Sequence, residues 1–205
     1  VLDEVTDYVF EVIQNSNFAQ EVHESFMDLA VGTGVLAVTE GDSIHPINFS
    51  AIPLPHLVLD AGVDDRIDHV YRMRTVKCRD LKIMYPKATI PDQINQRMTR
   101  DPEMENDILE VCCKDYTVQN DDASVFYAID MMSKAVIYQE SFRGVGSNPY
   151  ICFRWSKCAG EIYGRGPLMN ALSAIKTTNL TIELILENAQ TVSYTHLTLP
   201  TSGGV

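Results

Sequence analysis

The sequence has no long apolar run and few basic residues for its length. No stretch approaches the roughly 20 apolar residues that a membrane-spanning helix needs, although 45% of the 205 residues are hydrophobic. Lysine and arginine number 16 against 28 aspartates and glutamates, which gives a net charge of −12. Non-specific binding to nucleic acid needs cations that displace phosphate counterions. The charge therefore disfavours a protein that grips nucleic acid, but it permits one that lets DNA slide past, or one whose acidity only maintains solubility.

The cysteines lack the spacing of a metal site. There is no C-x-x-C and no histidine at ligand spacing among the five of them, and two are adjacent. An odd number with this pattern predicts free thiols in a reducing compartment, without zinc or another cofactor. These residues are Cys78, Cys112, Cys113, Cys152 and Cys158.

Catalytic motifs are also missing from the sequence. It contains no G-x-S-x-G, no H-E-x-x-H and no serine or cysteine with a base at a known spacing. We therefore predict a protein that is not an enzyme. An enzyme domain, the first alternative, would need a pocket that gathers distant residues such as His56, Asp68 and His69.

The best-patterned segment runs from Arg154 to Ala189. Pro167 follows a glycine-punctuated turn, in the first helical position where its missing N–H costs nothing. A seam repeating every 3.5 residues then predicts a helix that packs lengthwise on other helices, often identical ones. The alternative is an ordinary core helix of one globular domain. The seam consists of Leu168, Leu172, Ile175, Asn179, Ile182 and Leu186, of which only Asn179 is polar.

The segments before this helix predict an α+β fold. Two amphipathic helices are expected at residues 2–13 and 18–29, the second with N-cap residues at Asn15 to Asn17. Gly32-Thr33-Gly34 lies between a helix and a strand, the reverse of the order in a nucleotide-binding loop, so it is interpreted as a turn. Strands and short helices follow, and meandering strands favour an antiparallel sheet. The strands are expected at residues 35–38, 47–52, 57–59, 67–75, 108–118, 125–132, 135–142 and 150–155, and the short helices at residues 76–84, capped by Thr75, and 90–98.

Several motifs in this order resemble a known family. RW, then GE-x-YGRGP, then a long helix is similar to the head-to-tail connector (portal) proteins of short-tailed, podovirus-type phages. Upstream, SNF at residues 16–18, GTG-x-L at 32–36 and IPL at 52–54 also agree with that family. The resemblance covers about residues 2–190. Its motif residues in the best-patterned segment are Arg154, Trp155, Gly160, Glu161, Tyr163, Gly164, Arg165, Gly166 and Pro167.

The resemblance implies a structural subunit of a dodecameric ring at one capsid vertex, through which DNA enters and leaves. Residues 1–160 would form the α+β wing-like region, and residues 161–190 the turn and the first part of a stem-like helix. The implied partners are identical subunits, double-stranded DNA that passes without tight binding, and the terminase, capsid, scaffold and tail adaptor proteins, with no membrane. The implied location is the portal vertex of the virion, after assembly in the host cytoplasm. A generic helical interaction module is the second alternative.

The end of the chain has a different character. VSYTHLTLPT, from Val192 to Thr201, looks like the translation of a transposase-end adaptor used in sequencing libraries. Residues 191–205 are therefore predicted to be a non-native tail, excluded from reasoning about the fold. This interpretation implies an internal fragment of a longer protein, and it gives Tyr194 and His196 no functional meaning.

Overall fold

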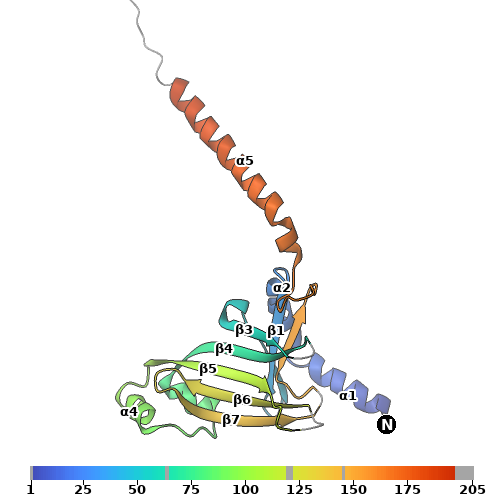
Figure 1. The fold of residues 1–205 in the computed structure, drawn as a ribbon, viewed down its shortest axis with the longest axis vertical. Helices are drawn as coiled ribbons and strands as arrows, with labels where there is room; N and C mark the ends of the chain where they lie inside the picture. Colours follow the sequence, from blue (N-terminus) through green and yellow to red (C-terminus); the bar gives the residue numbers. More distant parts are fainter. Residues whose placement is uncertain (1, 63–64, 119–121, 145, 197–205) are drawn as a thin grey trace, which may run out of the picture. The chain divides into compact units, whose positions relative to one another are not determined.

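A computed structural model of the protein describes residues 2–62, 65–118, 122–144 and 146–196. The chain divides into two compact units, Val1–Gly166 and Pro167–Val205. The first unit contains all the strands and four of the helices, and the second contains one long helix (Figure 1). The mixed composition confirms the α+β prediction.

Two antiparallel sheets form the first unit. The smaller sheet has the order β2-β1-β8, and helix α2 (Phe18–Leu29) packs on it, preceded by α1 (Leu2–Gln14). The larger sheet has the order β3-β4-β5-β6-β7. The strands are β1 (Thr33–Glu40), β2 (Ile47–Ala51), β3 (Leu57–Ala61), β4 (Ile67–Lys77), β5 (Glu105–Lys114), β6 (Ala123–Asp130), β7 (Ala135–Arg143) and β8 (Tyr150–Arg154).

Short helices complete the first unit. The 3-10 turn η1 (Leu54–His56) precedes β3, and η2 (Cys78–Asp80) leads from β4 into α3 (Leu81–Met84). Helix α4 (Asp92–Arg100) starts after Pro91 and ends two residues beyond the predicted position. Lys134 adopts a left-handed backbone conformation, with φ of 54°, in the tight connection between β6 and β7.

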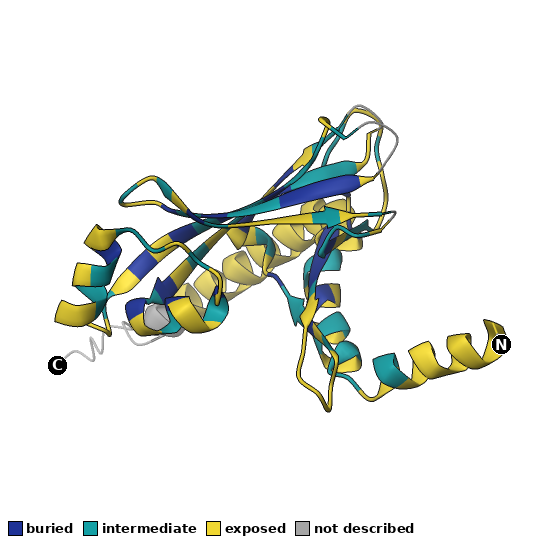
Figure 2. Ribbon diagram, turned by 90° about the horizontal axis from the view of Figure 1, so that it is seen from below, coloured by how far each residue is buried: buried dark blue, intermediate teal, exposed yellow. Residues whose placement is uncertain are grey.

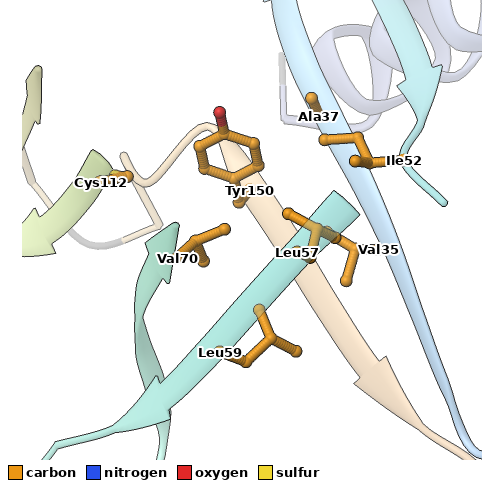
Figure 3. Packing of buried hydrophobic residues seen from close by; sticks show 8 residues of the cluster. All are labelled: Val35, Ala37, Ile52, Leu57, Leu59, Val70, Cys112 and Tyr150. Carbon is orange, nitrogen blue, oxygen red and sulfur yellow. The ribbon is translucent and has the colours of Figure 1, made fainter. Parts of the chain in front are cut away.

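Two hydrophobic cores hold the sheets and short helices together. The first lies between the sheets, where Val35 and Ala37 of β1 and Tyr150 of β8 pack with Leu57 and Val70 of the larger sheet (Figure 3). The second packs the short helices on one face of the larger sheet, through Leu81 and Ile94 against residues such as Ile108. Buried positions therefore concentrate in the strands, whereas most of α1 is exposed (Figure 2).

Two local predictions were wrong. A helix was expected to start at Val76 under a Thr75 cap, but Val76 and Lys77 continue β4 opposite Asn106 and Glu105. Val76 is 6% exposed in the second core, and the Thr75 hydroxyl donates to Asp107 Oδ1 at 2.8 Å. Core packing thus overrides the local capping signal.

The second correction concerns Asn17, one of the three residues expected to cap α2. Asn17 occupies the N-cap position but makes no capping bond with its side chain. Its amide instead pairs with the backbone of Phe49 in β2, donating to the carbonyl at 2.7 Å and accepting from the N–H at 2.9 Å. The Ser16 hydroxyl accepts from Phe18 N at 3.2 Å. Asn17 therefore joins α2 to the edge of the smaller sheet.

The second unit is α5 (Pro167–His196), a helix of 30 residues. At 1.5 Å per residue it is about 45 Å long. It starts at Pro167 as predicted but continues seven residues past Ala189, because no glycine or proline follows until Pro200. Residues 197–201 of the predicted adaptor-derived segment lie outside the described residues, and its origin stays a prediction.

Candidate assembly surfaces

Glycines let two backbone segments that are far apart in the sequence touch within the first unit. We name Trp155–Gly166 the strap, because it lies along the turn between α2 and β1. A Cβ at Gly164 would be 2.2 Å from the carbonyl oxygen of Gly32, and one at Gly32 would be 2.0 Å from that of Gly164. A Cβ at Gly166 would be 2.2 Å from Ala30 O. Such contacts exclude any side chain at these positions, so the GTG and GRG motifs form one junction.

Hydrogen bonds extend the pairing of β8 with β1 into the strap. Trp155 N donates to Gly32 O at 2.9 Å, and Gly166 N donates to Val31 O at 2.8 Å. Between them, Gly164 N donates to the Thr33 hydroxyl at 2.8 Å, in a buried position. Since buried backbone groups need partners, these bonds hold the strap against the turn between α2 and β1.

Side chains of the strap and of Arg154, the last residue of β8, complete its attachment. The Tyr163 hydroxyl accepts from Leu59 N of β3 at 3.0 Å, and Arg154 donates to Ile162 O at 3.0 Å. On the exposed side, Arg165 Nε donates to Glu161 Oε2 at 2.9 Å, within a two-pronged ion pair. The hydrogen bond from Arg165 holds the pKa of Glu161 below its usual value. Thus the strap spans both sheets and ends where α5 begins.

The structure brings most of the predicted motif residues together. Gly164, Gly166 and Tyr163 lie in the junction, while Gly160 sits in a left-handed turn with φ of 77°. Trp155 is 60% exposed, so its indole is not part of the core. Sequence reasoning missed Thr33 and Leu59 as partners of the strap. The middle residue of the GTG motif was the available signal for Thr33.

A buried carboxylate links the two sheets elsewhere in the first unit. Glu110 of β5 is 4% exposed, and it accepts from the hydroxyls of Tyr85 at 2.6 Å and Tyr150 at 3.1 Å. Arg72 Nη1 lies 3.4 Å from its Oε2, and Arg74 Nη1 lies 3.5 Å from its Oε1. Burial, reinforced by Glu110, raises the pKa of both tyrosines, so they remain protonated donors. This cluster ties β8 and the residue after α3 to the larger sheet.

The residues that the enzyme alternative would need do not form one site. Asp68 Oδ1 and His69 Nδ1 are 2.7 Å apart, but His56 precedes Leu57, which pairs with Arg72. His56 is thus aligned near Met73 of β4. Met73 and His69 are four residues apart, which is about 13 Å along the strand. Asp68 borders a cavity of about 150 Å³, and none of the three lines the larger cavity of about 440 Å³ beside Glu110.

The described residues offer neither a metal-binding cluster nor a membrane-crossing helix. That part of the chain contains no group of three or more His, Cys, Asp or Glu side chains placed to hold a metal ion. None of its helices combines the length and apolarity that crossing a membrane requires. The cysteines are free thiols, with Cys78 and Cys112 buried.

Helix α5 exposes an apolar surface along its length. Every residue from Pro167 to Val192 is exposed. Of the predicted seam, Leu168 is 48%, Leu172 47% and Ile182 50% exposed. Asn179 is exposed too, and the only charged residues over this range are Lys176, Glu183 and Glu187. Exposed apolar surface on this scale marks an interaction site.

Helix α1 is also uncovered, but its surface is of another kind. Leu2 is 82%, Val5 54% and Val9 46% exposed. The helix carries the carboxylates Asp3, Glu4, Asp7 and Glu11 and no basic residue. Indeed, no lysine or arginine occurs in residues 1–65, which contain 12 acidic residues.

A comparison with protein families decides the class. A family model described as bacteriophage head to tail connecting protein matches residues 1–204. The chain belongs to this family. No curated protein matches the chain.

Membership in the connector family agrees with the resemblance of the strap motifs. Connectors are structural phage proteins, so the chain has a structural role at the junction of head and tail and is a component of the virion. Capsid and tail proteins are the corresponding assembly partners. The two uncovered helices, α1 and α5, are therefore the candidate assembly surfaces, whereas the strap is bonded within its own chain.

Proposed function

We propose that this connector chain is the subunit of a dodecameric portal ring at the capsid vertex, through which DNA is packaged and ejected. The exposed apolar α5 is the observation that carries the proposal. A helix with a 3.5-residue seam packs on copies of itself, and a closed ring of identical contacts leaves an axial passage. The 161–190 segment then acts as the turn and stem-like helix, and residues 1–160 as the wing-like region.

The charge of α5 suits a passage for DNA. Its described residues carry only three charged side chains, and the hydroxyls of Thr177, Thr178 and Thr181 bond to carbonyls one turn earlier. Such a wall offers few cations to phosphates, so double-stranded DNA would pass without tight binding. We assign no catalytic role to the chain: the terminase supplies the energy, while scaffold, capsid and tail adaptor proteins bind the ring. Assembly takes place in the host cytoplasm.

Electron microscopy of the purified protein tests the proposal. Rings with an axial hole are expected, whereas a compact monomer with a ligand-sized cleft would favour the enzyme alternative. Helical bundles without a hole would favour the generic interaction module.

Asn179 allows a finer test of the seam. We propose that it fixes the register between neighbouring helices, as a polar residue in an apolar seam can do. An Asn179→Leu variant should then give rings of mixed subunit number in electron micrographs. Uniform rings would remove the register role and leave Asn179 facing the channel.

A further inference from the structure

One face of the larger sheet presents apolar residues that neither core uses. Val58, Tyr71, Val111 and Tyr127 are aligned in one row across four strands, and Met73, Leu109, Ile129 and Val136 in a second row. We call these eight residues the outer face. None of them belongs to either hydrophobic core, whose members from the same strands, such as Val70 and Ile108, point to the opposite side.

The outer face remains accessible in the single chain. Val58 is 61%, Met73 40% and Val136 50% exposed, and the other five residues are partly exposed. The two rows contain no charged residue. Polar groups border them, as at Thr75, whose hydroxyl donates to Asp107. An antiparallel sheet that faces water normally carries polar residues there, whereas an apolar centre with tyrosines and a polar rim is typical of a protein interface.

Helix α1 has a complementary surface. Leu2, Val5, Val9, Val12 and Ile13 fall on one side of the helix at 100° per residue, while its four carboxylates occupy the opposite side. Leu2, Val5 and Val9 stay open in the single chain, where α1 contacts α2. A 13-residue helix is marginal in water by itself, so this apolar stripe needs a cover.

We infer that the apolar stripe of α1 packs on the outer face of a second copy of the chain. The dimensions agree: α1 is about 20 Å long, and five strands 4.8 Å apart are about 19 Å across. With the stripe on the sheet, the carboxylates point to solvent and meet no charge on the outer face. The absence of basic residues from α1 disfavours an anionic membrane or nucleic acid as the partner.

The pattern of α5 makes it a poorer match for the outer face. Apolar residues occur around α5, at Leu180, Leu184 and Ile185 as well as on its seam, which suits helix neighbours on more than one side. A single stripe with a charged back, as in α1, suits one flat apolar surface. The surface area of the two rows is also smaller than the ~800 Å² that each partner buries in a stable complex. The α1 contact therefore acts beside α5 packing, and it rests on the proposed ring.

Photo-crosslinking of the 205-residue chain tests the inference. Benzoylphenylalanine replaces Tyr127 on the outer face or, as a control, Ile83, which is 77% exposed on α3. Mixing isotope-labelled and unlabelled chains identifies links between copies by mass spectrometry. We expect position 127 to link to residues 2–13 of a second copy. Links to α5, links between two sheets, or a yield no higher than that of position 83 would overturn the inference.

Substitutions in α1 supply the matched comparison. Val5→Glu with Val9→Glu puts carboxylates on the apolar stripe and should lower the crosslink yield on the order of tenfold. Asp3→Asn with Asp7→Asn changes the opposite side and should preserve it, and equal effects of the two pairs would contradict the assigned face. Electron microscopy of the same protein separates the hypotheses: rings without this crosslink overturn only the α1 contact, and a crosslink without rings overturns the portal proposal.

Discussion

The strap and α5 are consecutive in the chain, yet they are built in opposite ways. In the strap, Gly164 lies against a backbone carbonyl, the Tyr163 hydroxyl accepts from a main-chain N–H, and Ile162 O accepts from Arg154 of β8. In α5, every residue from Pro167 to Val192 is exposed, and the hydroxyls of Thr177, Thr178 and Thr181 donate to carbonyls of the helix itself. The strap is completed by its own chain, whereas α5 has apolar surface left for other chains. Substitutions should therefore affect folding in one region and assembly in the other.

The largest effect on folding is expected at the buried carboxylate of the first unit. Glu110→Ala leaves Arg72 without its buried partner and removes the acceptor of two tyrosine hydroxyls. Breaking a buried ion pair costs about 3–5 kcal/mol, which urea denaturation would measure. Glu140→Ala, which removes an exposed acceptor of Tyr138, should cost about 1 kcal/mol or less. Equal losses would show that the Glu110 cluster does not join the sheets.

The glycine junction should give the next largest effect. Gly164→Ala forces a Cβ to within 2.2 Å of Gly32 O, where only backbone can move away. Overpacking of this kind costs about 1–3 kcal/mol or more. Gly160→Ala is the control in the same strap, because a Cβ there meets nothing within 4 Å and suffers only its left-handed φ of 77°. A smaller loss of unfolding free energy in Gly164→Ala than in Gly160→Ala would contradict the close approach.

The ion pair on the surface of the strap should contribute least to folding, and only above acidic pH. Arg165 lowers the pKa of Glu161 in the folded protein below the value in the unfolded chain. Its stabilisation is therefore complete above the ordinary carboxyl pKa and disappears as the pH falls through the folded pKa. Melting temperatures of the wild type and Glu161→Gln should differ slightly at pH 7 and converge as the pH falls through the lowered pKa of Glu161. A difference in melting temperature that grows on acidification would contradict the lowered pKa of Glu161.

Substitutions in α5 should change assembly and leave the stability of the first unit almost unaltered. Leu172→Asp changes a residue that is 47% exposed, so the unfolding free energy of the first unit should change by less than about 0.5 kcal/mol. Sedimentation velocity should nevertheless show loss of self-association, because a carboxylate now interrupts the apolar seam. Ser173→Asp, off the seam, serves as the control. Destabilisation as large as that of Gly164→Ala would mean that α5 belongs to a core.

The sequence predicted the elements better than their contacts. Periodicity and turn residues located α5, most strands and the order of the strap motifs, because these signals are local. The division into two sheets depends on pairings such as Thr33 with Arg154, far apart in the chain. Thr75 and Asn17 had the local features of helix caps, but each bonds to a strand instead. Partners of this kind are set by tertiary packing and leave no short-range pattern.

The absence of lysine and arginine from residues 1–65 has a practical consequence for experiments. Trypsin cleaves after basic residues, and the first of these is Arg66. Helices α1 and α2 and strands β1 to β3 would therefore leave a digest as one peptide of residues 1–66. A protease specific for carboxylates would cut within α1 at Glu4 and Glu11. Peptide mapping of this region thus depends on the acidity that distinguishes it from the rest of the connector chain.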